Sequence, residues 1–197
     1  FLALSRIFNK TANYQAVKHL LYISKNKIAE WEPFLNMDIN RTLQLSSGIS
    51  FFVLEDYDHA LSFIKGAVTY ITAGIRKELF SVGQMLLLLI TYSMNNEKLF
   101  EAQYRTTYGF FYKRKKHAFE KAVMECLRRT FYMTDNKEKI KEYQKAIAII
   151  NQNSDDIFQR NIFTIFNFFG WLESKVQRIS YRRYVEQKVK KEKLQYN

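Results

Sequence analysis

The stretch LQLSSGISFFVLEDYDHALSFIKGAV, residues 43–68, decides the fold class. From Tyr57 its apolar and small residues recur at i, i+3, i+4 and i+7, which is the pattern of a helix with one buried face. Asp56 directly precedes this pattern and can accept hydrogen bonds from the orphan amides of a first helical turn. Gly48 and Ala60 can face each other across a hairpin, where small residues let two backbones approach closely. The stretch therefore predicts two antiparallel helices joined by a tight turn.

Helical patterns also fill the rest of the chain. One proline and six glycines among 197 residues favour long helices with short connections over strand-rich folds. The first strongly buried position of each second helix aligns at Val17, Ala60, Ala102 and Tyr143, at spacings of 43, 42 and 41 residues. Near-equal spacing is typical of stacked helical hairpins. We therefore expect an all-α solenoid of stacked antiparallel helix pairs, with about 8–10 helices, as a single helical-repeat domain over residues 1–197.

The helix boundaries have their own signals. Periodic apolar segments predict helices at roughly 39–54, 76–94, 117–133 and 155–172, besides the hairpin. Short polar side chains that can cap a first turn precede the helices. They are Asp38, Asp56, Asn95, Asn96, Asp135, Ser154 and Asp155.

The stretch 43–68 resembles a tetratricopeptide repeat. That family places a small residue in the first helix, an aromatic residue three positions on, then Asp-Tyr and two alanines seven apart. The matching residues are Gly48, Phe51, Asp56, Tyr57, Ala60 and Ala67. Gln44 stands where the family usually has Trp, Thr72 where it usually has Pro, and the period of about 42 exceeds the family's roughly 34. The resemblance is thus to a long-period, bacterial variant.

This resemblance implies a non-catalytic scaffold module that binds a protein or peptide. In the family, the first helices of the pairs line a concave binding surface. The groove-facing residues of the second pair would then be Leu45, Ile49 and Phe52, which could equally be core residues in a variant with longer helices. In the later pairs Arg128 and Tyr132 are the analogous candidates, and they would suit an acidic or extended peptide.

The positive charge suggests a second function. The net charge is +12, and most of the excess falls in residues 113–129 and 173–197. Such segments can bind nucleic acid through phosphate contacts, with neighbouring aromatic rings stacking on bases. The candidate basic patch comprises Lys113, Arg114, Lys115, Lys116, Arg182 and Arg183. The same residues are also consistent with a solvated face of a lysine-rich chain.

A third hypothesis is the sensory or dimerisation half of a bacterial regulator. The chain starts at FLALSRIF without an initiator Met, and we expect it to be the C-terminal part of a longer protein. The sequence leaves the oligomeric state open. A single cysteine allows no disulfide within the chain, which fits a reducing, cytoplasmic location. The longest apolar run, Met85–Ile90, is far shorter than the roughly 18 residues of a membrane span, so we expect none.

Catalytic and metal-binding patterns are not found. His19, His59 and His117 are widely separated and belong to no HExxH or similar motif. Asp56 and His59 could offer metal ligands, but a helix cap is the better interpretation because no further His or Cys stands nearby. Cys126 lies among apolar residues of a helix, as a buried thiol does. We therefore expect no enzyme activity, no catalytic residue, no cofactor and no metal.

Overall fold

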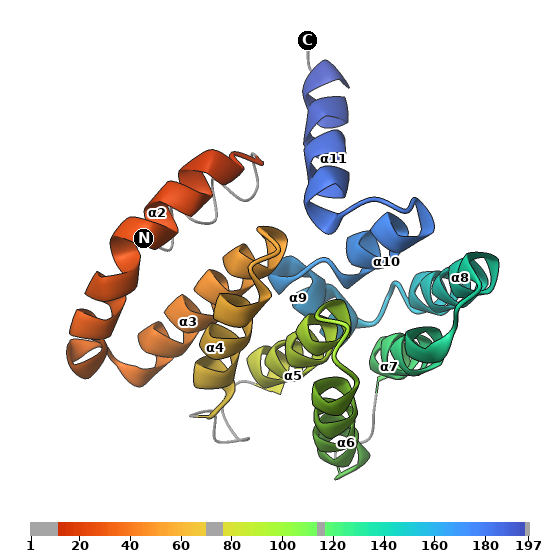
Figure 1. The fold of residues 1–197 in the computed structure, drawn as a ribbon, viewed down its shortest axis with the longest axis horizontal. Coiled ribbons are helices and arrows are strands. Elements are labelled where there is room, and N and C mark those ends of the chain that lie inside the picture. The colour runs from red at the N-terminus through yellow and green to blue at the C-terminus, as the bar shows by residue number, and fades with distance from the viewer. Residues whose placement is uncertain (1–11, 70–76, 114–116, 196–197) are drawn as a thin grey trace.

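The computed structural model describes residues 12–69, 77–113 and 117–195; their regular secondary structure is all helical, with no strand among them (Figure 1). This confirms the all-α class. The helices, in chain order, are α2 (Tyr14–Trp31), the 3-10 helix η1 (Glu32–Phe34), α3 (Met37–Val53), α4 (Tyr57–Thr69), α5 (Lys77–Ser93), α6 (Glu97–Lys113), α7 (Ala118–Tyr132), α8 (Asn136–Gln152), α9 (Ile157–Ile165), α10 (Phe168–Val176) and α11 (Tyr181–Gln195).

Helices α3 and α4 form the predicted hairpin. Its turn places Glu55 at φ 63° and lets the Asp56 amide donate to the Phe51 carbonyl at 3.0 Å. Asp56 caps α4, because its Oδ1 accepts from the His59 amide at 3.3 Å. Ala60 is fully buried as expected, but Gly48 lies against Ile64, one turn further along α4. The close approach of the two backbones is therefore shifted by one turn from the predicted Gly48–Ala60 pair.

Helix α5 is the core of the molecule. Every side chain from Ser81 to Thr91 is buried, and α5 packs against α3, α4, α6, α7 and α9. A helix that is apolar on all sides must be covered on all sides, which accounts for the run MLLLLI. Figure 1 shows α9 and α10 near the middle of the view, between the α3–α5 group and α8, with α11 projecting away from them. No helix among the described residues is both long and apolar enough to cross a membrane.

The expected helix over 155–172 is wrong, because the chain breaks between α9 and α10. Phe166 is extended (φ −145°, ψ 130°), and the Asn167 side chain caps α10 by accepting from the Gly170 amide at 2.8 Å. The break turns the buried Phe166 ring toward Phe52, with ring centroids 5.7 Å apart. Burial of that aromatic ring offsets the lost helical hydrogen bonds.

The repeat alignment is only partly reflected in burial. Val17, Ala60 and Tyr143 are buried, as the alignment requires. Ala102 is exposed, and Phe100 and Tyr104 occupy the buried face of α6 instead. The expectation that Ala102 is a buried position is therefore wrong.

Three of the seven predicted cap residues, Asp56, Asn96 and Asp135, are confirmed. The side chains of Asn96 and Asp135 accept from amides in the first turns of α6 and α8, at 3.1 and 2.8 Å. Asn36, rather than Asp38, caps α3. Asp156, rather than Ser154 or Asp155, caps α9. In both corrected cases the cap is a neighbouring short polar residue, so the helix starts at a slightly different position.

The contact at Gly48 predicts a steric effect on stability. A Cβ there would stand 2.6 Å from Ile64 Cγ1 and 3.2 Å from the Ile64 backbone nitrogen. Gly48→Ala should therefore lower the free energy of unfolding by about 1–3 kcal/mol, measured by urea denaturation. Gly109→Ala is the matched control, because a Cβ at Gly109 in α6 meets no heavy atom within 4 Å. It should stabilise the protein by up to about 1 kcal/mol. Equal midpoints for wild type and Gly48→Ala would show that the hairpin contact is not tight.

Candidate functional site

A pocket of about 790 Å³ lies between α6 and α7, and we call it the α6–α7 groove. Its lining contains aromatic, apolar and charged side chains, with three cations and two carboxylates among them. The lining residues are Glu101, Tyr104, Tyr108, Lys121, Met124, Glu125, Arg128, Arg129, Tyr132 and Met133. A volume of this size is in the range of ordinary ligand-binding clefts, about 300–1,000 Å³.

A row of tyrosines runs along α6, and its first two members line the groove. Tyr104, Tyr108 and Tyr112 are four residues apart, so they share one face of the helix. Their ring centroids are 6.3 and 6.1 Å apart, and successive rings are inclined by 24° and 21°. Their exposed fractions rise from 8% through 42% to 74%. We call this row the tyrosine ladder; it leads from the core out to solvent.

The α7 side of the groove supplies the positive charge. The Arg128 guanidinium stands 5.3 Å from the centroid of the Tyr104 ring, which is a cation–π contact. Arg129 donates to Glu142 at 3.0 Å and lies 3.9 Å from Glu125. Within the described part of the chain, no carboxylate forms an ion pair with Arg128. The charge of Arg129 is therefore balanced locally, whereas that of Arg128 faces an aromatic ring.

One end of the groove is closed by contacts between the two helices. Phe100 of α6 stacks on Phe131 of α7, with ring centroids 4.2 Å apart. The Tyr132 hydroxyl donates to Glu101 Oε1 at 2.5 Å. This hydrogen bond, with burial and the charge of Glu101, raises the pKa of Tyr132 to about 12. The hydroxyl therefore stays protonated at neutral pH and remains a donor.

The structure separates the expected partner-binding residues into two groups. Arg128 and Tyr132 both line the α6–α7 groove. Leu45 and Phe52 are buried, and Ile49 is partly buried against the core. The expectation that these three face an open groove is wrong.

Helix α3 is covered at Phe52 by aromatic residues that lie more than a hundred positions later in the chain. The Phe52 ring packs against Phe166, and it lies 6.4 Å from the Tyr181 ring. These two aromatic residues occupy the space in front of α3 that the resemblance assigned to a partner.

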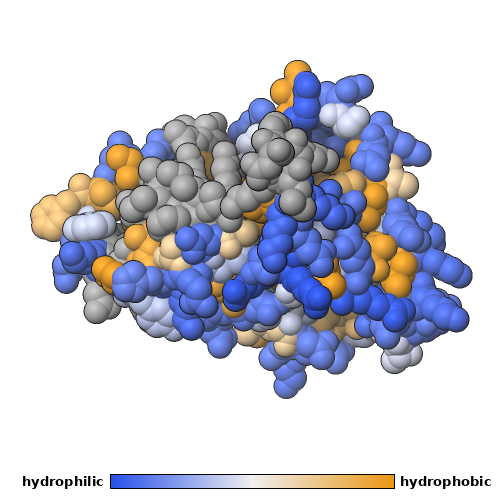
Figure 2. Space-filling view, turned by 90° about the horizontal axis from the view of Figure 1, so that it is seen from above, coloured by the Kyte–Doolittle hydropathy of each residue, from blue (hydrophilic) through white to orange (hydrophobic). Residues whose placement is uncertain are grey.

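The candidate basic patch is not one surface. Lys113 ends α6, while Arg114, Lys115 and Lys116 lie outside the described residues. Arg182 and Arg183 belong to α11, which lies on the opposite side of the molecule from α6 (Figure 1). Arg182 donates to Glu186 at 3.0 Å and contacts the Tyr14 ring at 5.1 Å. The view toward α11 shows hydrophilic residues over much of that face, interrupted by apolar ones (Figure 2).

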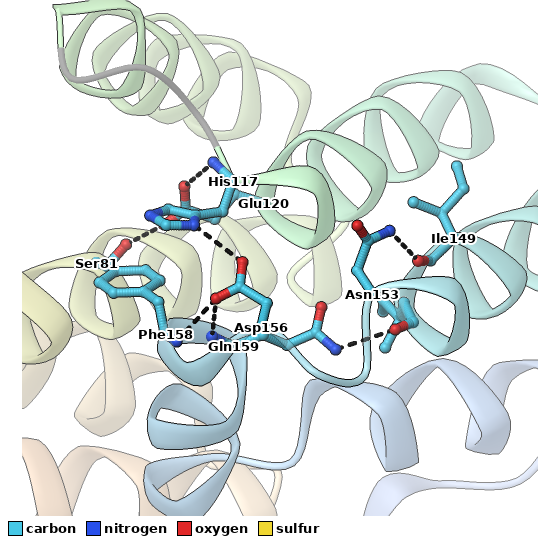
Figure 3. A network of polar contacts seen from close by, with 9 residues as sticks. Ser81, His117, Glu120, Ile149, Asn153, Asp156, Phe158 and Gln159 are labelled. Carbon is cyan, nitrogen blue, oxygen red and sulfur yellow. Dashed lines mark hydrogen bonds and ion pairs between the residues drawn. The ribbon is translucent and has the colours of Figure 1, made fainter.

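A second polar cluster joins the starts of α7 and α9 (Figure 3). His117 Nδ1 lies 3.2 Å from Asp156 Oδ2, and the His117 ring stacks on Phe158 with centroids 4.0 Å apart. The buried Glu120 carboxylate accepts from the His117 amide at 2.9 Å and from the Ser81 hydroxyl of α5. Burial acts to raise the pKa of Asp156, but hydrogen bonds from His117 and two backbone amides outweigh it and lower that pKa. The cluster fixes helix ends, so we assign it to the fold.

The residues considered above for metal binding or catalysis, Asp56, His59 and Cys126, take part in helix capping or are buried in the core. His59 Nδ1 contacts the Asp56 carboxylate at 2.8 Å, and its ring stacks on Phe51. Among the described residues, no three His, Cys, Asp or Glu side chains are grouped so that they could hold a metal ion. Burial raises the pKa of the Cys126 thiol to about 12, so the thiol is protonated at neutral pH.

The tyrosine ladder, of which Tyr104 and Tyr108 line the groove, is the feature that sequence analysis missed. Its signal is present as tyrosines at i, i+4 and i+8 beside a basic segment. The same spacing is typical of core residues on a helix, however. Only the rising exposure along the ladder separates the two interpretations.

Comparison with models of protein families, with curated proteins and with solved structures gives no match to this chain. The geometry of the α6–α7 groove is therefore the basis for inferring a function.

The pairing of Glu142 beside the groove predicts a pH-dependent contribution to stability. Its carboxylate is 10% exposed and accepts from Lys145 and Arg129. The Lys145 hydrogen bond, opposed by burial and aided by Arg129, lowers the pKa of Glu142. The stabilisation is thus complete above the unfolded-state pKa of about 4.3, and it is lost as the pH falls through the lower folded-state pKa.

Glu142→Gln should therefore lower the free energy of unfolding by about 1 kcal/mol at pH 7. The difference between variant and wild type should shrink toward zero near pH 3 or below. Urea denaturation of both proteins at the two pH values measures this. A difference of equal size at both pH values would contradict an ionic contribution.

Proposed function

We propose that this chain is a non-catalytic binding module of the helical-repeat type, which binds an acidic protein segment in the α6–α7 groove. The observation that carries the proposal is Arg128, stacked on Tyr104 beside the exposed Tyr108, with no paired carboxylate among the described residues. Tyrosine and arginine are enriched at the energetically important positions of protein interfaces. A rigid ring and a pre-oriented cation lose little freedom when a partner binds.

The helical-repeat part of the proposal rests on the resemblance of residues 43–68 to tetratricopeptide repeats and on the regular spacing of the pairs. We propose stacking of antiparallel pairs as the architecture. The packing of α9 on α5 modifies a simple stack, in which each repeat contacts only its neighbours. Under this proposal the open binding surface is the α6–α7 groove rather than the face of α3.

An acidic protein segment fits the groove better than nucleic acid does. Glu101 and Glu125 line the groove, and Arg129 is held by Glu142. A nucleic-acid strand would bring a phosphate per nucleotide past these carboxylates, whereas an acidic peptide can place its charges at Arg128 alone. The tyrosine ladder keeps single-stranded nucleic acid as the second candidate, because aromatic rings stack on bases.

Binding of an acidic probe peptide tests the proposal. A fluorescently labelled peptide of nine residues with mixed Glu and Val should bind the full chain, and its counterpart with Lys in place of Glu should not, as measured by fluorescence anisotropy. Arg128→Ala should weaken the acidic peptide about tenfold, because it removes the cation aimed into the groove. Arg160→Ala, an exposed arginine of α9, should leave the affinity unchanged.

Oligothymidylate of comparable length serves as the competing probe in the same assay. If it binds tightly and loses affinity in Arg128→Ala while the acidic peptide does not bind, the groove is a nucleic-acid site. Failure of both probes to bind a correctly folded chain, checked by circular dichroism, overturns the proposal.

A further inference from the structure

Helix α11 has two sides of opposite character. One side packs on the rest of the molecule, where the Tyr184 hydroxyl donates to Glu173 of α10 and the Tyr181 ring lies 5.3 Å from the Phe166 ring. Beyond these contacts α11 projects away from the other helices (Figure 1). The other side of the helix therefore meets solvent.

The side of α11 that meets solvent is cationic. Arg183, Gln187, Lys190 and Lys191 stand at i, i+4, i+7 and i+8, a spacing that places them on one face of a helix. All four side chains are exposed. We call these four residues the α11 cationic face.

The positive charge of the α11 cationic face is not balanced by the described part of the chain. There, none of Arg183, Lys190 and Lys191 forms an ion pair with a carboxylate. The neighbouring carboxylate of Glu186 accepts from Arg182 at 3.0 Å instead. The face thus presents three cations to an anionic partner.

The composition of the α11 cationic face indicates the chemistry of that partner. Protein interfaces concentrate aromatic residues and Met at their centres, and a helix that binds a membrane surface needs an apolar face. Single-stranded nucleic acid is held by aromatic rings that stack on its bases. The face has three cations and one amide and none of these apolar groups. Such side chains are the ones that contact the phosphates of a duplex.

The length of the face also suits a duplex. Seven residues separate Arg183 from Lys190, which is about 10.5 Å along the helix axis. A DNA duplex carries one phosphate charge per about 1.7 Å of its axis, so about six phosphates fall within that length. Each cation of the face can therefore approach a phosphate. Contacts of this kind do not read the bases.

We infer that the α11 cationic face binds the phosphate backbone of duplex nucleic acid, independently of base sequence. The face lies on the opposite side of the molecule from α6 (Figure 1). It is therefore a second binding site, and the inference does not depend on the function proposed for the α6–α7 groove.

Binding of a DNA duplex to the full chain tests this inference. A fluorescently labelled duplex of about 20 base pairs is titrated at about 50 and 200 mM NaCl and followed by fluorescence anisotropy. The combined variant Arg183→Ala, Lys190→Ala and Lys191→Ala should weaken binding at least tenfold at the lower salt concentration. The slope of log affinity against log salt should become shallower by about 2.7, because each phosphate contact contributes about 0.9.

A control variant with the same net charge separates the face from a general charge effect. The combined variant Lys98→Ala, Lys137→Ala and Lys141→Ala removes three exposed lysines of α6 and α8. It lowers the net charge equally but should leave the duplex affinity within about twofold of wild type. Arg128→Ala should also leave it unchanged, because Arg128 belongs to the groove. Circular dichroism checks that the variants are folded.

Several outcomes would overturn the inference. Equal losses in the two combined variants would show that net charge alone attracts the duplex. Absence of duplex binding to wild type, tighter binding of oligothymidylate than of the duplex, or a strong preference between two duplexes of different sequence would each contradict backbone binding. Vesicles with anionic lipid and a polyglutamate peptide are the competing probes. If either binds through the same three residues more tightly than the duplex does, the face is a membrane or acidic-protein site.

Discussion

Helix α5 is buried on all sides from Ser81 to Thr91. The helices packed around it are arranged so that they cover this apolar surface. Each fully buried leucine contributes about 1.5–3 kcal/mol relative to exposure, and the run of four leucines from Leu86 to Leu89 is buried entirely or nearly so. Polar pairs fix the two ends of the helix. Ser81 donates to Glu120 near its start. Tyr92 near its end shares hydrogen bonds with Thr130 at 3.0 Å and Tyr143 at 2.6 Å. Apolar burial thus holds the neighbours on α5, and the polar pairs set their positions along it.

The α6–α7 groove follows from that arrangement. Both helices pack on α5, and Phe100 and Phe131 join them at one end. Beyond this stacked pair the outer faces of α6 and α7 meet solvent rather than each other. The groove therefore has rigid walls that come from regular helices, which position side chains more firmly than loops do. The tyrosines of the ladder belong to α6, and the three cations of the groove belong to α7.

Local sequence signals predicted local structure well. The α3–α4 hairpin, its cap at Asp56 and the caps at Asn96 and Asp135 each depend on residues within a few positions of one another. The break at Phe166 was missed, because no glycine or proline marks it and the apolar pattern continues through it. Its cause is a ring contact with Phe52, more than a hundred residues earlier. The same contact explains why Phe52 is core rather than groove. Arg128 and Tyr132 both line the α6–α7 groove, because their exposure depends on the local period of α7.

The contact between α5 and α9 has a consequence for the order in which the chain acquires structure. A ribosome releases the chain from its N-terminus, and α5 emerges well before α9 is made. Until α9 arrives, part of the most apolar helix has no partner within the chain. A nascent intermediate that ends after α8 thus presents the surface that favours self-association or capture by a chaperone. In the finished protein, the contact of α9 with α5 joins segments that are far apart in the sequence. We therefore expect the protein to become stable in one cooperative step late in synthesis, rather than one repeat at a time.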